Sequence, residues 1–456
     1  MKRSCVGLIF ILFLVTSVGR AQTWSPVSTG IKGSAANTTW ALFPYDSMLF
    51  AGGWFSTAGS ASVNSLAQWD GSTWSTMNIG TSGYISAFAY YNGNIYAGGE
   101  FDTIGGIIAH NIAMWNGSTW SPVGKGIRDI QYGVYTMAVY KGELYAGGSF
   151  DSADGKPIFG IAKWNGTSWS AVGSGVYAAD EADGVFSLCV YNGYLYVGGG
   201  FDSAGGIPVK EIARWDSTNW SSVGGSMNDG GTVNSMTVYN GNLYAGGQFD
   251  TAGGVITHRI AMWNGSTWAA LDSGIQGEAG WSIVSALAVY NGKLYAGGYF
   301  DTVNKNPINC IASWDGSAWS SVGNINSGGS IDAICVFNNS LYIGGGFDSA
   351  GGVAAKNIAM LTTPSAVNEI DNSENFNVFP NPSNGVFILQ ANSQWLRANS
   401  QIEIYNAFGQ KIYSKTFSTL NSQFSIDLTT QSSAVYFYRI TDDKGQLLGS
   451  GKLIKE

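Results

Sequence analysis

Charged residues are scarce in this 456-residue chain, where 22 Lys and Arg and 30 Asp and Glu make up 11% of the sequence. The formal net charge of -8 leaves no excess of basic residues. Because binding to a nucleic-acid backbone depends on Lys and Arg, this composition argues against nucleic acid as a partner. Histidine is scarcer still, since His110 and His258 are the only two and their spacing fits no metal-ligand signature. We therefore expect no metal and no cofactor.

Catalytic motifs are also missing. The sequence contains no Gly-x-Ser-x-Gly nucleophile turn and no phosphate-binding loop ahead of a helix. It therefore offers no catalytic residue, and we expect a binding protein in preference to an enzyme.

Cysteine is rare, and beyond the N-terminal Cys5 the residues Cys189, Cys310 and Cys335 form an odd set. Cys189 and Cys335 stand where other repeats of the chain have Ala or Thr. This favours small buried residues over a disulfide or a metal site.

Long apolar runs are limited to the start of the chain, and no later stretch is long enough to span a bilayer as a helix. Lys2 and Arg3 precede the apolar residues 6–15, and Gly19-Arg20-Ala21 offers a small-x-small cleavage site. The run is well short of the roughly 20 residues of a membrane span. We predict a cleaved signal peptide over residues 1–21.

Glycine and aromatic residues are abundant, with 64 Gly, 17 Trp, 23 Tyr and 22 Phe, which is typical of a turn-rich all-β protein. The motif Ala/Val/Ile-Gly-Gly-x-Phe recurs in steps of 46 to 51 residues. Its seven copies start at Ala51, Ala97, Ala146, Val197, Ala245, Ala296 and Ile343.

Each repeat predicts four strands. In the sixth repeat the first strand ends at Tyr290. The other three cover Lys293 to Phe300, Cys310 to Trp314 and Trp319 to Val322. The first two are joined by Asn-Gly, a dipeptide favoured in tight hairpins. The double glycine in the second strand indicates close approach of a neighbouring backbone or aromatic ring. Four antiparallel strands in about 50 residues are typical of a propeller blade.

The ends of the repeat region complement each other. Six repeats carry Trp-x-x-x-x-Trp, which we interpret as packing between blades, whereas the seventh ends at Thr362 without a fourth strand. The segment Thr23 to Val27 is a fourth strand with no blade before it. We therefore predict a seven-bladed β-propeller over residues 22–362, closed by its N-terminal strand.

The repeats resemble the kelch repeat and related bacterial propeller repeats that contain Tyr-x-Gly-Gly-x-Phe, although no Arg follows the fourth strand here. This resemblance implies the fold and leaves the chemistry open, since propellers serve many functions.

The repeat stops after Leu361, and residues 363–375 read as a linker. Residues 376–456 open with Pro380-Asn381-Pro382 and contain Ile404-Tyr405-Asn406-Ala407-Phe408-Gly409, Ala434-Val435-Tyr436 and Gly451-Lys452-Leu453. They resemble the type A C-terminal sorting domain of the type IX secretion system, known from the Bacteroidetes. The resemblance implies a small β-sandwich, export by that machinery, and a secreted or outer-surface location. An ordinary β-sandwich binding domain is the alternative.

One acidic position recurs in six repeats, beginning with Asp102, and a Ser or Thr follows it each time. Turn capping by the Asp side chain is one interpretation, and a ring of calcium ligands is another. The motif also resembles the Bacteroidetes O-glycosylation motif, which implies glycans at Thr103, Ser152, Ser203, Thr251, Thr302 and Ser349.

The connections from each fourth strand to the next first strand vary in length and content, and they hold aromatic and acidic residues such as Trp40 and Tyr84. Ligand sites concentrate on variable loops over a rigid scaffold. The residues we expect to bind a ligand are Tyr132, Tyr177, Glu181, Glu278 and Trp281.

Two classes of function remain open. Aromatic faces and carboxylates suit a secreted recognition or adhesion module for an extracellular glycan or protein. A polysaccharide hydrolase or lyase would instead need two carboxyl groups roughly 5–10 Å apart at the channel mouth.

Overall fold

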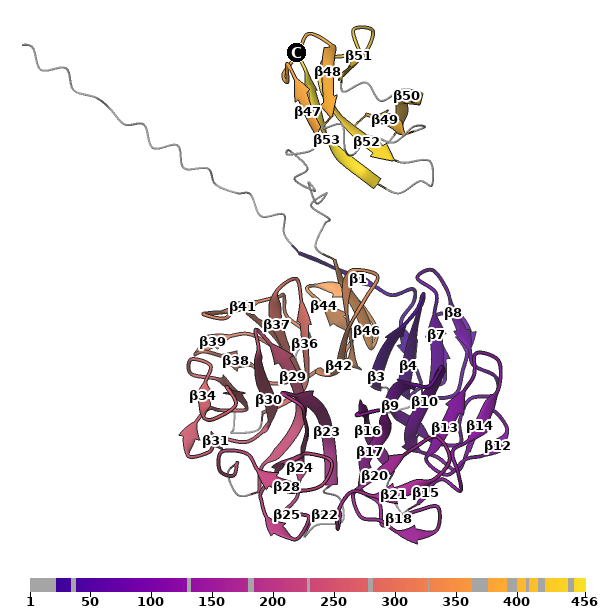
Figure 1. Cartoon of the computed structure of the whole chain (residues 1–456), viewed down its shortest axis with the longest axis vertical. Coiled ribbons are helices and arrows are strands. Elements are labelled where there is room, and N and C mark those ends of the chain that lie inside the picture. The colour runs from indigo at the N-terminus through magenta and orange to yellow at the C-terminus, as the bar shows by residue number, and fades with distance from the viewer. Residues whose placement is uncertain are drawn as a thin grey trace, which may run out of the picture. The chain divides into compact units, whose positions relative to one another are not determined.

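A computed structural model describes residues 22–33, 38–128, 133–178, 184–227, 230–277, 282–326, 328–362, 376–391, 400–406, 410–416, 423–441 and 447–456. The chain divides into two compact units, Met1–Thr363 and Pro364–Glu456. All regular structure in the described residues is β-strand, arranged in small antiparallel sheets (Figure 1). Among these residues there is no helix that could cross a membrane.

The described part of the first unit contains seven four-stranded sheets. Their first strands are β3 (Thr38–Tyr45), β9 (Tyr84–Tyr91), β16 (Val134–Tyr140), β23 (Gly184–Tyr191), β29 (Thr232–Tyr239), β36 (Ile283–Tyr290) and β42 (Ser330–Phe337). Their second strands are β4 (Met48–Trp54), β10 (Asn94–Glu100), β17 (Glu143–Gly148), β24 (Tyr194–Gly200), β30 (Asn242–Gln248), β37 (Lys293–Tyr299) and β43 (Ser340–Gly346).

The outer half of each sheet is shorter. The third strands are β7 (Leu66–Trp69), β13 (Ile112–Trp115), β20 (Ile161–Trp164), β27 (Ile212–Trp215), β33 (Ile260–Trp263), β40 (Ile311–Trp314) and β46 (Ile358–Thr362). The fourth strands are β8 (Trp74–Thr76), β14 (Trp120–Pro122), β21 (Trp169–Ala171), β28 (Trp220–Ser222), β34 (Trp268–Ala270), β41 (Trp319–Ser321) and β1 (Thr23–Pro26). The strands predicted for the sixth repeat agree with these bounds to within about one residue.

The first strands contact one another in sequence around the unit. Each of them contacts the first strand of the next sheet, and β42 of the last sheet contacts β3 of the first. Glycine permits this approach: a Cβ built on Gly297 of β37 would lie 2.6 Å from a side-chain atom of Ile331. The predicted close approach is therefore confirmed, although the side chains at the first glycine of each pair are Ile, Val or Thr and not an aromatic ring.

The N-terminal strand supplies the fourth strand of the last sheet. In the pairing of β1 with β46, Thr23 lies opposite Thr362. The Trp24 indole donates a 2.7 Å hydrogen bond to the carbonyl oxygen of Val322 in the preceding repeat. Trp120, Trp169, Trp220, Trp268 and Trp319 make the same contact with the repeat before them. The interpretation of the fourth-strand Trp as packing between repeats is confirmed.

Two-residue strands lie in the connections that follow the second and the fourth strands of the sheets. They are β2 (Ile31–Lys32), β5 (Thr57–Ala58), β6 (Ala61–Ser62), β11 (Thr103–Ile104), β12 (Ile107–Ile108), β15 (Ile127–Arg128), β18 (Ser152–Ala153), β19 (Lys156–Pro157), β22 (Val176–Tyr177), β25 (Ser203–Ala204), β26 (Ile207–Pro208), β31 (Thr251–Ala252), β32 (Val255–Ile256), β35 (Ile275–Gln276), β38 (Thr302–Val303), β39 (Asn306–Pro307), β44 (Ser349–Ala350) and β45 (Val353–Ala354). These hairpins were not predicted from the sequence, because two-residue strands carry no periodic signal.

The second unit contains two sheets in its described residues. One consists of β47 (Phe376–Phe379), β48 (Val386–Ala391) and β51 (Gln423–Asp427), and the other of β50 (Lys411–Thr416), β49 (Gln401–Tyr405), β52 (Ala434–Thr441) and β53 (Leu447–Lys455). Phe387 and Leu389 of the first sheet share one buried cluster with Ile402 and Ile404 of the second.

Candidate functional site

Every first strand of the seven sheets carries one residue more than its partner. In β42, Ile331 lies opposite Gly345 and Ala333 opposite Gly344, so Asp332 has no partner in the ladder. Such a β-bulge redirects one side chain and is frequent next to binding sites. We call these seven residues the bulge positions: Trp40, Ser86, Tyr135, Phe186, Asn234, Ser285 and Asp332.

The second glycine of each Gly-Gly pair makes room for the bulge. A Cβ built on Gly298 would lie 2.0 Å from the carbonyl oxygen of Ile283, one residue before the bulged segment in β36. Because that atom belongs to the backbone, no side chain can be accommodated there without moving the strand. The repeated glycine thus fixes the bulge, while the residue at the bulge itself is free to vary.

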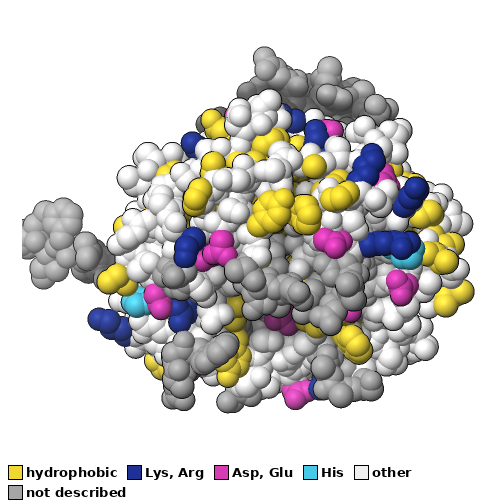
Figure 2. All heavy atoms as spheres, turned by 90° about the horizontal axis from the view of Figure 1, so that it is seen from below, with side chains coloured by type: hydrophobic (Ala, Val, Ile, Leu, Met, Phe, Trp, Pro, Cys, Tyr) yellow, Lys and Arg dark blue, Asp and Glu magenta, His cyan; other side chains and the backbone are white. Residues whose placement is uncertain are grey.

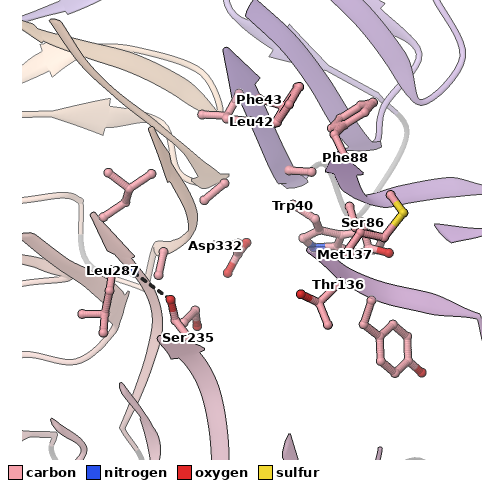
Figure 3. Close-up of a pocket in the computed structure, with 17 residues that line it drawn as sticks. Trp40, Leu42, Phe43, Ser86, Phe88, Thr136, Met137, Ser235, Leu287 and Asp332 are labelled. Carbon is pink, nitrogen blue, oxygen red and sulfur yellow. Dashed lines mark hydrogen bonds between the residues drawn. The ribbon is translucent and has the colours of Figure 1, made fainter. Parts of the chain in front are cut away.

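A cavity of about 230 Å³ lies among the first strands and is lined by their residues at and beside the bulge positions. Its lining includes Trp40, Ser86, Tyr135, Ser285 and Asp332, which come from five of the seven sheets. Figure 3 shows Asp332 projecting into the space between the strands, with Trp40 and Thr136 across from it. The described lining therefore combines aromatic rings, hydroxyl groups and one carboxyl group.

Asp332 stands in an environment that disfavours its charge. Burial raises the pKa of its carboxyl to about 6, and a 3.4 Å hydrogen bond from the Ser330 hydroxyl offsets this only in part. None of the residues that line the cavity in the described part of the chain is Lys, Arg or His. Cys310 lies near enough for the two groups to influence each other, but burial raises its thiol pKa to about 11 and its Sγ donates to the Gly329 carbonyl oxygen.

Aromatic contacts hold all three rings at the bulge positions. Trp40 meets Tyr84 edge-on with ring centroids 4.6 Å apart, and the Tyr84 hydroxyl donates a 2.5 Å hydrogen bond to Glu100. Tyr135 packs against Phe186 of the next sheet at 5.6 Å. These contacts orient the rings in advance, which lowers the entropic cost of using them to bind a ligand.

Of the five residues predicted to bind a ligand, the structure describes only Tyr177. Tyr132, Glu181, Glu278 and Trp281 lie outside the described residues, so their role stays a prediction. Tyr177 is 42% exposed on β22 and packs against Phe159 with ring centroids 5.1 Å apart, away from the residues that line the cavity.

The placement of Trp40 and Tyr84 in irregular loops was wrong, because both belong to first strands. The bulge positions were missed altogether. A signal for them does exist in the sequence: this is the one column of the first strand that ranges from Ser to Trp and Asp, while the next column holds only Ala, Ser or Thr.

The recurring acidic residues make local contacts. Asp348 pairs with Lys356 at 2.5 Å, Asp250 pairs with Arg259, and Asp102 lies 3.5 Å from His110. Turn capping is also seen at the residue that begins the turn between third and fourth strands. At Asn264, for example, the side-chain oxygen accepts 2.9 Å hydrogen bonds from the backbone N–H groups of Ser266 and Thr267.

The remaining sequence candidates show no metal cluster or disulfide. No group of three or more His, Cys, Asp or Glu among the described residues has a geometry that would hold a metal ion. Cys189, Cys310 and Cys335 are free thiols, of which Cys189 is half-buried and the other two are buried. The six Ser and Thr of the expected glycosylation motif are half-buried in the short hairpin strands.

The surface shows no broad region of one charge in the view of Figure 2, where acidic and basic side chains are scattered among uncharged atoms. This fits the low charge content of the sequence.

Comparison with known proteins gives one match to a family and several to solved structures. PorZ, an essential bacterial surface component of the type-IX secretion system of Porphyromonas gingivalis, is 15% identical, with a TM-score of 0.46 over 95% of this chain and 61% of PorZ. A fungal alcohol oxidase of the AA5 family in complex with copper is 11% identical, with a TM-score of 0.41 over 95% of this chain and 99% of the oxidase.

This chain thus spans less than two thirds of the length of PorZ. None of the curated proteins matches it. Residues 377–456 match the family model described as the secretion system C-terminal sorting domain. The chain is therefore a protein handled by the type IX secretion machinery through its C-terminal sorting domain, and it is secreted and attached to the cell surface.

Proposed function

We propose that residues 22–362 form a seven-bladed, kelch-like β-propeller, and that this propeller is a recognition or adhesion module for a glycan or protein outside the cell. Seven similar sheets, contacts between successive first strands and the pairing of β1 with β46 support the architecture. The sorting domain at residues 377–456 accounts for its delivery to the cell surface.

The bulge positions carry the functional part of this proposal. The bulge position differs in chemistry between repeats, and its seven members are three aromatic residues, three small polar residues and one carboxylic acid. Rings with a few polar groups around a concavity are the usual composition of a ligand site.

Binding to a glycan array and to host or bacterial surface proteins tests the proposal. The mature chain is compared with Trp40→Ala and, as a matched control, Tyr90→Ala, an exposed aromatic nearer the other end of a first strand. Truncating a buried aromatic anchor costs about 2 kcal/mol or more, so Trp40→Ala is expected to weaken binding by more than about tenfold. Equal affinity of parent and Trp40→Ala, with loss in Tyr90→Ala, would place the site at the opposite end of the strands.

A polysaccharide hydrolase or lyase is the alternative function. It is favoured by Asp332, because a carboxyl with a pKa of about 6 suits a general acid. The second carboxyl that such chemistry requires would have to come from acidic loop residues such as Glu181 or Glu278. Loss of polysaccharide turnover in Asp332→Asn with unchanged binding would support the enzyme.

A further inference from the structure

The carboxyl of Asp332 stands in the cavity without a counter-charge from any described lining residue. The hydrogen bond from Ser330 is long at 3.4 Å, and none of the described residues that line the cavity carries a positive charge. Asp332 is half-buried, and a carboxylate partly removed from water without a positive partner destabilises the folded protein.

The fold itself does not need this charge. The equivalent bulge positions hold Ser86, Ser285 and Asn234, each neutral and each in a first strand with the same register shift. Ser86 satisfies its hydroxyl by donating a 2.7 Å hydrogen bond to the Val134 carbonyl oxygen of the next sheet. An acidic residue at the seventh position therefore has a reason other than the stability of the sheet.

The surroundings of Asp332 match an organic cation. The Trp40 ring can stabilise a positive charge through its face, and the hydroxyl groups of Ser285 and Thr136 can accept its remaining N–H donors. Leu42, Phe88 and Leu287 add apolar surface on which the alkyl stem of a side chain can pack.

The volume of the cavity limits the size of the ligand that it can hold. Its volume of about 230 Å³ is below the roughly 300–1,000 Å³ of pockets that take drug-sized molecules. A single extended side chain suits it better than a segment of oligosaccharide.

Building on the recognition function proposed above, we propose that this cavity binds the cationic end of a lysine or arginine side chain presented by a partner protein, with Asp332 as the counter-ion. The apolar side chains of Leu42, Phe88 and Leu287 then pack against the stem. The site selects a partner with an exposed basic residue at a protruding position.

The test measures binding of hexalysine and hexaarginine peptides to the full mature chain by calorimetry. Fully Nε-acetylated hexalysine is the neutral probe. Because the chain carries a net charge of -8, any polycation is attracted to it without specificity. The control variant is therefore Asp46→Asn, which removes the same charge at an exposed hairpin where five other repeats already have Asn.

We expect Asp332→Asn to weaken binding of at least one cationic peptide by more than about tenfold, since losing one partner of a buried charge pair is costly. Asp46→Asn should bind like the parent, and the acetylated peptide should not bind. Asp332→Ser, which copies two other repeats, provides a second variant whose fold the chain tolerates at equivalent positions. Equal loss in Asp46→Asn and Asp332→Asn would overturn the proposal.

A glucosamine hexamer separates this inference from the proposed function. If it binds at the Trp40 side of the cavity while neither peptide binds, the recognition function holds and the protein-side-chain inference fails. If Trp40→Ala and Asp332→Asn leave every interaction of the chain unchanged, both are refuted.

Discussion

Replacing Asp332 by Asn should stabilise the protein, and the gain should depend on pH. The ordinary pKa of this carboxyl is 3.8, and burial raises it to about 6 in the folded state. The folded state therefore binds more protons than the unfolded state between about pH 4 and pH 6, so stability falls as the pH rises through that window. Above it, the cost of the charge is fully present.

The magnitude follows from the shift. About two pKa units at 1.36 kcal/mol each give roughly 3 kcal/mol as an upper value. Unfolding entropies of about 2.1 cal/mol/K per residue give roughly 0.7 kcal/mol/K for about 340 residues. Asp332→Asn should therefore melt about 4 °C above the parent at about pH 8, and within about a degree of it at about pH 4.

Thermal melts of parent, Asp332→Asn and Asp46→Asn across this range provide the assay. Tyr135 also lines the cavity, and the Cys310 thiol interacts electrostatically with Asp332. Burial raises the pKa of that thiol to about 11, well above the window. A difference between parent and Asp332→Asn that stays constant with pH would refute the reasoning. So would a variant that becomes less stable than the parent as the pH rises.

Four further expectations concern the rest of the chain. Thr39 is fully buried with an unpartnered hydroxyl where the other six repeats have Val or Ile, so Thr39→Val should raise the free energy of unfolding by about 1 kcal/mol in denaturant titrations. Deleting residues 23–27 should expose the edge of β46 and cause aggregation, and monomeric elution with a parental melting temperature would contradict this. A chain ending at Thr363 should fold but stay in the periplasm, and its efficient release into the medium would refute the role of the tail. Intact mass of the secreted protein should exceed that of the bare polypeptide if the Asp-Ser/Thr motifs carry glycans, and an equal mass would end that idea.

Repeats made most of the fold predictable. The Asn-Gly turn between the first two strands adopts the positive φ values expected at Asn291 and Gly292, and the strands it joins were placed closely. Thr23 to Val27 was predicted as a fourth strand because its Trp matches those of the complete repeats, and it pairs accordingly. In each case the same local signal is read several times, which removes the ambiguity of a single short strand.

The candidate site was harder to predict, because it depends on a bulge. Alternation along β42 gives no sign of the extra residue between Ile331 and Ala333, although Asp332 and Ile334 both line the cavity. The sequence also favours loops for binding residues, since loops vary most. Here part of the variation lies inside regular strands, next to the glycine that permits it.

The pairing of β1 with β46 means that the last sheet is complete only when both ends of the repeat region are present. Thr23 and Thr362 are 339 positions apart, so the first strand to be synthesised finds its partner only after the last repeat has been made. Until then both edges stay open, and a product cut short in any repeat keeps them open permanently. Open edges invite aggregation and proteolysis. Completing the last sheet therefore favours chains that contain both β1 and β46.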